Sequence, residues 1–120
     1  MKEIKAYIRP NFLESVIKHL EEAGASDITV LRVDALGALA DQEDDRKHII
    51  RKYNEKYSKI AKIEIVCRDD EAENFMKIIQ KHAYFGEPGD GRIFLSPILR
   101  AIHIRTGEQD EEALCKISCD

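Results

Sequence analysis

The sequence predicts one α+β domain in which an antiparallel sheet carries two helices on a single face. The chain has 120 residues, the usual length of one domain. Each half of the chain repeats the same order: a segment with strand alternation, a segment with helical spacing, and a second strand segment. A long polar segment separates the two halves. This βαββαβ order is typical of the ferredoxin-like fold.

Five segments have the side-chain pattern of β-strands. The first alternates charged and apolar residues, as a half-buried strand does, and it ends at Pro10, which has no amide hydrogen to give to a neighbouring strand. The others are short runs rich in apolar residues. The predicted strands are residues 3–9, 27–36, 60–67, 93–95 and 98–104.

Two segments place apolar residues three or four positions apart, which is the spacing of one helix face. Asn11 and Glu14 predict a capping box at the start of the first helix, and Gly24 suits the left-handed position after its last turn. Asp70 and Glu73 predict the start of the second helix. The expected core faces are Phe12, Leu13, Val16, Ile17 and Leu20 in the first helix, and Phe75, Ile78 and Ile79 in the second.

The segment from Gly37 to Ser58 lacks both patterns. It is about twenty residues long, and loops of that length inside a compact domain usually carry a function or are disordered. Four of its acidic residues, at 41 and 43–45, precede its basic residues at 46, 47, 51 and 52, an order that also suits a short helix. We therefore expect a functional loop with a short helix. The alternative is a solvated hairpin tip without a role.

Composition limits the classes of function. The net charge of −4 disfavours nucleic acid as the main partner. No apolar run approaches the roughly 20 residues needed to span a bilayer, and the first ten residues lack the apolar centre of a signal peptide. The three cysteines form no disulfide framework. These features together predict a cytoplasmic protein.

The most informative stretch is residues 86–108, which opens with three glycines in six positions and continues with basic residues. Glycine lets backbone amides approach a ligand closely, and consecutive amides in a turn form a concave anion site. Arginine adds forked contacts with phosphate oxygens. The spacings of a Walker loop and of a Rossmann fingerprint are both absent. The predicted phosphate-binding residues are Gly86, Gly89, Gly91, Arg92, Arg100 and Arg105.

Four motifs in this order resemble the PII signal-transduction proteins nearly end to end, from Lys2 to Leu114. They are KEIKAYIRP at residues 2–10, KIEIV at 62–66, GDGRIF at 89–94 and IRTGEQDEEAL at 104–114. The resemblance implies a ferredoxin-like homotrimer that senses nitrogen and energy status, with an adenine nucleotide in each cleft between subunits. It also implies a long T-loop that docks onto transporters, enzymes or regulators.

Position by position, the resemblance implies a domain at residues 1–114, with a T-loop at about 37–59 and a B-loop at about 84–92, and a tail at 115–120. It implies ATP, ADP or AMP as the ligand and leaves the role of magnesium open. No catalytic or metal-binding residue is implied. The nucleotide-binding residues would be Gly37, Gly89, Asp90, Gly91, Arg92, Arg100, His103 and Arg105, and the T-loop residues that contact a partner would be Arg46, Arg51, Tyr53 and Tyr57.

The chain departs from the family at both ends of its T-loop. Where the family reads glycine-phenylalanine-glycine-arginine-glutamine, this chain has Ala35 to Leu39, so it lacks an arginine for the outer phosphates and a glutamine for 2-oxoglutarate and magnesium. Ile60 replaces the lysine that pairs with the 2-oxoglutarate carboxylate. A dianion without these partners binds poorly, because unpaired charge is costly to bury. We expect 2-oxoglutarate sensing to be lost.

Two further departures lie near the predicted phosphate site. His103 stands where the family has the first arginine of an arginine-x-arginine pair, and it either makes nucleotide affinity sensitive to pH or has no role. Tyr84 and Phe85 replace a small polar pair, and Phe85 either stacks on adenine or, as we prefer, packs at a subunit boundary. With fewer contacts for the outer phosphates, ADP or AMP is expected to compete with ATP better than in typical family members.

We expect no covalent modification, redox chemistry or metal binding at three residues of the T-loop and tail. Tyr53 lacks the sequence that surrounds the modified tyrosine of enteric relatives, so apolar contact is preferred to uridylylation. Cys115 and Cys119 are expected to be free thiols rather than a redox pair or half of a zinc site.

The sequence therefore predicts a PII-like regulator that binds nucleotide and is not an enzyme. One alternative is a small phosphate-ester or acyl-phosphate hydrolase on the same fold, but its candidate group near the glycines is Asp90, which a turn also explains. The glycine and arginine pattern disfavours a CutA-like metal-tolerance trimer. The expected partners are further copies of the chain, adenine nucleotide and a regulated protein such as a membrane transporter, without nucleic acid.

Overall fold

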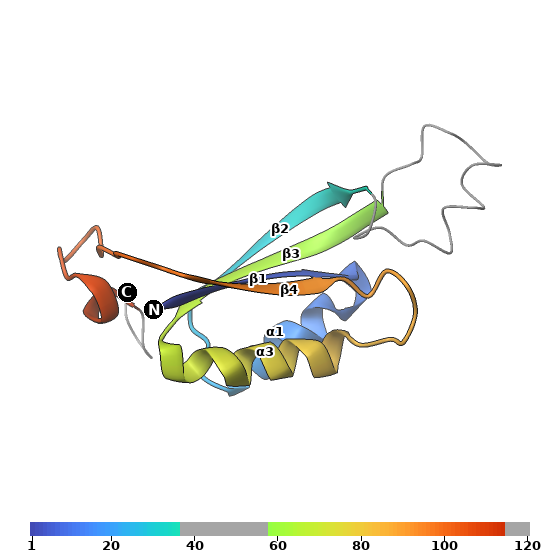
Figure 1. Ribbon diagram of the computed structural model, residues 1–120, viewed down its shortest axis with the longest axis horizontal. Coiled ribbons are helices and arrows are strands. Elements are labelled where there is room, and N and C mark those ends of the chain that lie inside the picture. Colours follow the sequence, from blue (N-terminus) through green and yellow to red (C-terminus); the bar gives the residue numbers. More distant parts are fainter. Residues whose placement is uncertain (37–57, 115–120) are drawn as a thin grey trace.

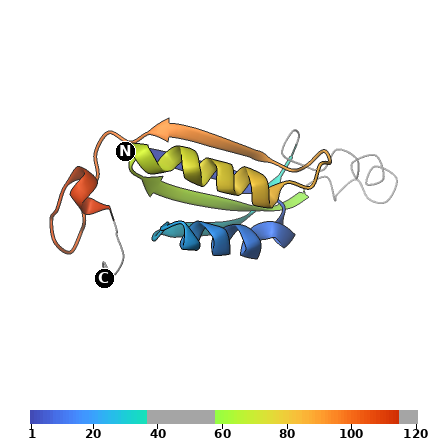
Figure 2. The same cartoon turned by 90° about the horizontal axis from the view of Figure 1, so that it is seen from below.

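The computed structural model describes residues 1–36 and 58–114 and shows a four-stranded antiparallel sheet with two helices on one face (Figures 1 and 2). The strand order β2-β3-β1-β4 places β1 between β3 and β4. The predicted ferredoxin-like fold is confirmed. No helix in these residues is long and apolar enough to cross a membrane. In chain order the elements are β1 (Lys2–Ile8), the 3-10 helix η1 (Pro10–Phe12), α1 (Leu13–Glu22), β2 (Ile28–Ala35), β3 (Ser58–Cys67), α3 (Asp69–Ala83), β4 (Arg92–Pro97) and the 3-10 helix η4 (Asp110–Ala113).

The core lies between one face of the sheet and the two helices. Alternate residues of β1 and β3 point into it, since successive strand side chains point to opposite faces. The helices supply the other half of the core from residues at helical spacing. Burying one large apolar side chain of this kind contributes about 1.5–3 kcal/mol. The largest fully buried side chains are Phe75, Ile4, Ile8, Leu20, Ile63, Ile65, Ile79 and Val16.

The first helix begins differently from the prediction. Pro10, whose ring fixes φ near helical values, opens a short 3-10 turn in which the Phe12 amide donates to the Arg9 carbonyl oxygen at 3.1 Å. Asn11 lies inside that turn, and Phe12 is the N-cap residue without a side-chain cap. The predicted capping box at Asn11 is therefore wrong. The predicted helix end is confirmed, because Gly24 follows the last turn with a φ of +100°.

The second helix, α3, begins one residue before the predicted cap at Asp70. The Arg68 amide donates to the Glu71 carboxylate, the Glu71 amide donates to the Arg68 carbonyl oxygen, and both distances are 3.1 Å. This exchange closes the first turn without Asp70. The Met1 amino group adds an ion pair with the Asp69 carboxylate at 2.9 Å, so the start of the helix is tied to the start of the chain.

The predicted strand at residues 98–104 is wrong, and the register of the sheet explains why. β4 pairs with β1 from Arg92, opposite Tyr7, to Pro97, opposite Lys2. Since β1 begins at Lys2, no strand residue of β1 remains to pair with the chain after Pro97. Residues 98–104 therefore continue outside the sheet, and Ile104 already lies in a turn.

Residues 98–114, here called the C-terminal arm, leave the sheet at the end where β1 starts (Figure 1). An isolated bridge between Ile102 and Gln109 folds the arm back on itself. The large apolar side chains of Leu99 and Ile104 are 86% and 98% exposed. These are the two most exposed large apolar side chains of the described residues.

Two histidines stack where α1 and α3 pack together. The ring centroids of His19 and His82 are 3.5 Å apart, and the rings lie within 12° of parallel. His19 Nδ1 is 2.7 Å from the Ser15 carbonyl oxygen, to which it donates. Burial, followed by the neighbouring His19 and Lys81, lowers the pKa of His82 below its ordinary value, and Glu22 opposes this shift.

The folded state is expected to lose stability as the pH falls below 6.5, the ordinary pKa of histidine. Because the folded-state pKa of His82 is lowered, unfolded chains bind more protons in this range, and the stability present above pH 6.5 is lost as the pH falls through the folded-state pKa. Thermal unfolding at several pH values between about 7.5 and 5.5 measures the effect. The unfolding temperature of the wild type should fall more than that of His82→Gln, with His103→Gln as control. Equal falls in wild type and His82→Gln contradict the prediction.

Candidate functional site

The glycine loop, residues 84–91, joins the end of α3 to the start of β4 (Figure 1). Its three glycines have φ angles in the left-handed region: +95° at Gly86, +100° at Gly89 and +98° at Gly91. Residues with a Cβ atom rarely adopt these angles, so the glycines allow the tight turns of this loop. The loop thus has the positive-φ conformation that its sequence predicts.

Gly91 needs the absence of a side chain for a second reason. A Cβ atom added there would overlap the carbonyl oxygen of Tyr7 in β1. One residue later, Arg92 pairs with Tyr7 and starts β4. The loop backbone therefore lies directly against β1 at the point where the loop joins the sheet.

The Asp90 side chain turns into the glycine loop and binds it from inside. Its Oδ2 accepts hydrogen bonds from the backbone amides of Phe85 at 3.0 Å and Gly86 at 2.9 Å. Its Oδ1 accepts from Arg9 Nε at 3.1 Å, and Arg9 Nη2 donates to the Pro88 carbonyl oxygen at 2.7 Å. Burial by itself would raise the pKa of Asp90, but the amides of Gly86 and Phe85 together with Arg9 hold that pKa below its ordinary value.

Arg9 is the residue of this arrangement that the sequence predictions missed. Tyr7 lies opposite Arg92 in the antiparallel pair of β1 and β4, and the same register continued by two residues places Arg9 opposite Asp90. The signal in the sequence is a basic residue just after the first strand and an acidic residue just before the fourth strand. This signal can be interpreted only when the register of β1 with β4 is known.

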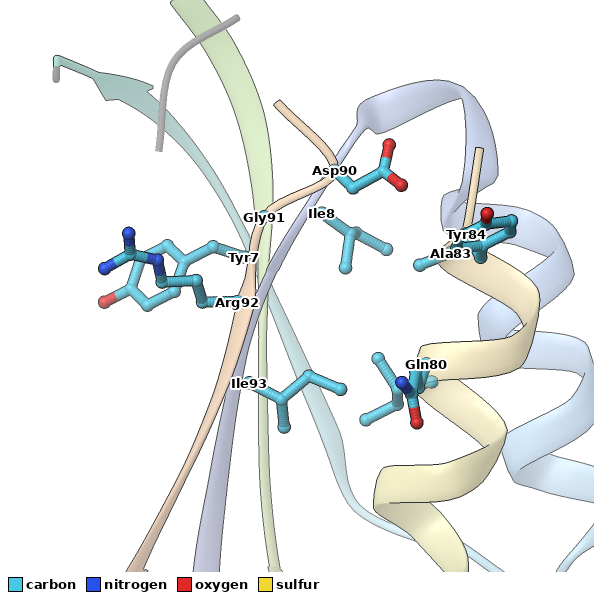
Figure 3. A pocket seen from close by; sticks show the side chains of 10 residues that line it. Tyr7, Ile8, Gln80, Ala83, Tyr84, Asp90, Gly91, Arg92 and Ile93 are labelled. Carbon is cyan, nitrogen blue, oxygen red and sulfur yellow. The ribbon is translucent and has the colours of Figure 1, made fainter. Parts of the chain in front are cut away.

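A pocket of about 300 Å³ lies between the glycine loop, β4 and the end of α3 (Figure 3). Ile8 and Ile93 point toward the helix on one side of the sheet. Tyr7 and Arg92 point the opposite way, onto the face of the sheet that carries no helix. The guanidinium group of Arg92 is therefore presented on the helix-free face, at the edge of the glycine loop.

The other predicted phosphate-binding residues belong to the C-terminal arm. They are separated from the glycine loop by the six residues of β4, which span about 17 Å at about 3.3 Å per residue. Figure 1 shows the glycine loop and the arm at opposite ends of β4. The arm residues concerned are Arg100, His103 and Arg105.

Side chains within the arm bind one another. Arg100 Nε donates to Asp110 Oδ1 at 3.1 Å, and Arg100 Nη2 donates to the side-chain oxygen of Gln109 at 2.7 Å. The Thr106 amide donates to His103 Nδ1 at 3.3 Å. A phosphate group that takes a forked contact with Nε and Nη2 of Arg100 would have to replace Asp110 and Gln109 there.

The structure thus divides the predicted nucleotide-binding residues into two groups that one chain does not bring together. One group forms the glycine loop and the start of β4: Gly89, Asp90, Gly91 and Arg92. The other group lies on the arm: Arg100, His103 and Arg105. The remaining predicted site residues lie outside the described residues, and so do the cysteines of the tail: Gly37, Arg46, Arg51, Tyr53, Tyr57, Cys115 and Cys119. The predicted short helix of the T-loop also lies there.

Comparison with known proteins identifies the family. The nitrogen regulatory protein P-II family matches the chain over residues 1–108, which include the whole sheet, both helices and the glycine loop. The chain belongs to the P-II family. The resemblance carried by the four sequence motifs is thereby confirmed.

Individual relatives of this P-II protein are similar over almost its full length. Nitrogen regulatory protein GlnK of Escherichia coli strain K12 is 34% identical over 116 residues, covering 95% of this chain and 100% of the relative. Nitrogen regulatory protein P-II 2 of Methanothermobacter thermautotrophicus is 38% identical over 114 residues, covering 95% and 97%. Nitrogen regulatory protein P-II of Pyropia yezoensis is 39% identical over 114 residues, covering 95% and 100%.

Membership of the P-II family decides between the regulatory protein and the hydrolase that the sequence left open. P-II proteins are regulatory signalling proteins rather than enzymes, and this chain is a P-II signalling protein. The hydrolase alternative is not favoured. Asp90, the group that a hydrolase would use, has its carboxylate directed into the loop at Arg9 and two backbone amides.

Replacing Gly91 by alanine is expected to destabilise this P-II protein by at least about 2 kcal/mol, since a left-handed alanine alone costs about 1–2 kcal/mol. The added overlap with the Tyr7 carbonyl oxygen raises that cost. Gly24→Ala is the matched control, because Gly24 has a φ of +100° and nothing within 4 Å of the added Cβ atom. Urea unfolding measures both variants. Equal losses would mean that the close approach at Gly91 contributes nothing.

Proposed function

We propose that this P-II protein binds an adenine nucleotide in each cleft between the subunits of a homotrimer and regulates a partner protein through its T-loop. The separation of the two groups of phosphate-binding candidates carries the proposal, since they lie at opposite ends of β4. In a head-to-tail ring, each subunit gives its arm to the glycine loop of its neighbour, and every cleft then contains both groups.

The chemistry of the cleft suits phosphate groups. Gly89 and Gly91 let backbone amides approach the phosphate oxygens, and Arg92 adds a forked contact from the helix-free face of the same subunit. Arg105 and His103 close over the phosphates from the arm of the neighbouring subunit. Arg100, the remaining arm candidate, joins them once it releases Asp110.

Exposed apolar surface supports contact between subunits. Leu99 and Ile104 are exposed on the arm, and Phe94 and Leu31 are exposed on the helix-free face of the sheet. Surfaces of this kind are usually covered in an assembly. A homotrimer covers both with copies of the same chain.

The ends of β2 and β3 support a T-loop that lies beside the nucleotide. β2 and β3 pair up to Ala35 opposite Ser58, at the end of the sheet where β1 finishes and the glycine loop begins (Figure 1). Gly37 acts as the hinge of the T-loop. Nucleotide favours one T-loop arrangement by its different affinity for the two states, and a partner such as a membrane transporter or an enzyme responds to that difference. The partner contacts are Arg46, Arg51, Tyr53 and Tyr57.

Alanine at Arg92 or at Arg105 is expected to abolish most nucleotide binding, because each removes a forked phosphate contact. When equal amounts of the two variants are unfolded and refolded together, about three quarters of the random trimers contain both variants. Each mixed ring has one cleft with both arginines, so about one nucleotide site in four should be restored. Calorimetric titration with ATP, ADP and AMP measures the number of sites. The same titrations show whether ADP or AMP competes with ATP, as the missing outer-phosphate contacts predict.

Each variant refolded alone is the control and should stay inactive. Mixing that restores nothing would place both arginines of a site on one subunit and contradict the cleft between subunits. Full affinity in both single variants would contradict nucleotide binding by these residues. Light scattering on the same samples checks that the assembly contains three chains.

2-Oxoglutarate is expected not to bind in the micromolar range, even with ATP and magnesium present. Ile60 stands where the family has a lysine, and it is buried and paired with Val33, so this position offers no cation to a carboxylate. Calorimetric titration of the nucleotide-loaded protein tests this. ATP titrated into the same preparation shows that the site is competent, and micromolar affinity for 2-oxoglutarate contradicts the prediction.

A further inference from the structure

We propose that Arg9 is a positioning residue of the nucleotide site, which acts through Asp90 to hold the glycine loop in the shape that receives phosphate. This inference rests on the proposed nucleotide binding and deepens it. The set of residues involved is here called the Arg9 latch: Arg9, Phe85, Gly86, Pro88 and Asp90.

Arg9 contacts three chemically different groups of the loop. Its Nε donates to the Asp90 carboxylate at 3.1 Å, and its Nη2 donates to the Pro88 carbonyl oxygen at 2.7 Å. Its guanidinium carbon lies 5.5 Å from the centre of the Phe85 ring. A planar guanidinium presents several donors and a flat face at once, whereas a lysine ammonium is a single point charge. The combination therefore requires arginine.

The ion pair of the latch is partly removed from water. The side chains of Arg9 and Asp90 are 19% and 25% exposed, whereas those of the surface pair Lys59 and Asp34 are 84% and 53% exposed. Solvent screens exposed pairs strongly, and many of them contribute nothing measurable. Arg9 and Asp90 are screened less and share further hydrogen bonds with the loop, so this pair constrains the loop.

The latch determines which amides remain for a ligand. Asp90 Oδ2 already accepts from the amides of Phe85 and Gly86, so the first turn of the loop is occupied from within. The amides of Gly89 and Gly91 are not partners of this carboxylate. The phosphate site is thus confined to the later part of the loop, beside Arg92.

This arrangement gives Asp90 a different role from a ligand contact. A carboxylate facing phosphate would repel it, and removing its charge would then strengthen binding. The Asp90 carboxylate instead faces Arg9 and the amides of the loop. Removing its charge should loosen the loop and weaken binding, so the two roles predict changes of opposite sign.

The latch also holds the Phe85 ring. Besides the guanidinium of Arg9, that ring lies 6.1 Å from the ring of Phe12, at the end of η1. Within one chain, Phe85 therefore contacts both Arg9 and the start of the first helix, while the residue stays 61% exposed. Arg9, Phe85 and Phe12 together join the glycine loop to the segment that follows β1.

The test compares four variants with the wild type: Arg9→Gln, Arg9→Lys, Asp90→Asn and the double variant Arg9→Gln/Asp90→Asn. Asp69→Asn is the matched control, since Asp69 also loses an ion pair but lies at the other end of α3, about 20 Å along the helix axis. Calorimetry measures the dissociation constant of ATP, thermal unfolding measures stability, and hydrogen exchange measures the Phe85 and Gly86 amides.

Arg9→Gln and Asp90→Asn are each expected to weaken ATP binding by about tenfold or more. The double variant should bind no more weakly than the worse single variant, because residues of one network act together. Both single variants should speed exchange at Phe85 and Gly86. Arg9→Lys should recover only part of the affinity, and Asp69→Asn should bind ATP like the wild type. Arg9→Lys also serves as the test variant if Arg9→Gln does not fold.

The possible failures are distinguishable. A wild type that binds neither ATP, ADP nor AMP overturns the proposed function and the latch with it. A wild type that binds ATP while Arg9→Gln binds equally well overturns the latch alone. The latch is also overturned if Asp90→Asn binds ATP more tightly, since the carboxylate then faces the ligand, or if the two single losses add in the double variant.

Discussion

The candidate site depends on one close contact, in which the backbone of Gly91 lies against the carbonyl oxygen of Tyr7. A side chain at Gly91 would push the glycine loop off the sheet. Without one, β4 starts opposite the end of the central strand β1, and its whole register with β1 follows. The same register brings Asp90 across from Arg9 and turns Arg92 onto the helix-free face. The shape of the glycine loop and the positions of Asp90 and Arg92 therefore both follow from the packing of the Gly91 backbone against β1.

The register also explains why a single chain holds only half of the proposed site. β4 can pair with β1 as far as Lys2, and the chain after Pro97 has to leave the sheet. Its basic and apolar side chains then lie a strand length away from the glycine loop. The same constraint that builds the loop thus leaves an arm suited to a neighbouring subunit. In the proposed trimer, nucleotide binding and assembly are linked, because each cleft is built from two chains.

Three arginines that look equivalent in the sequence have different surroundings in the fold. Arg9 is largely buried against the loop, Arg92 projects from the helix-free face, and Arg100 is bound to Asp110 and Gln109. Burial and bonding partners determine how strongly a guanidinium group stabilises the fold and how much of its charge is available to a ligand. The charge available to a ligand is therefore smaller than the count of arginines indicates, and part of it serves to shape the loop.

The order of strands and helices, the core faces except for Phe12, and the left-handed glycines were predictable from the sequence, because they depend on periodicity and on the backbone freedom of single residues. The four motifs also identified the family. The N-cap positions of Phe12 and Arg68, the loss of a strand after Pro97 and the role of Arg9 were not predictable. Each depends on which residues the packed sheet brings together across long stretches of chain. Tertiary structure alone determines those partners, because strand register is a property of two segments and not of either one.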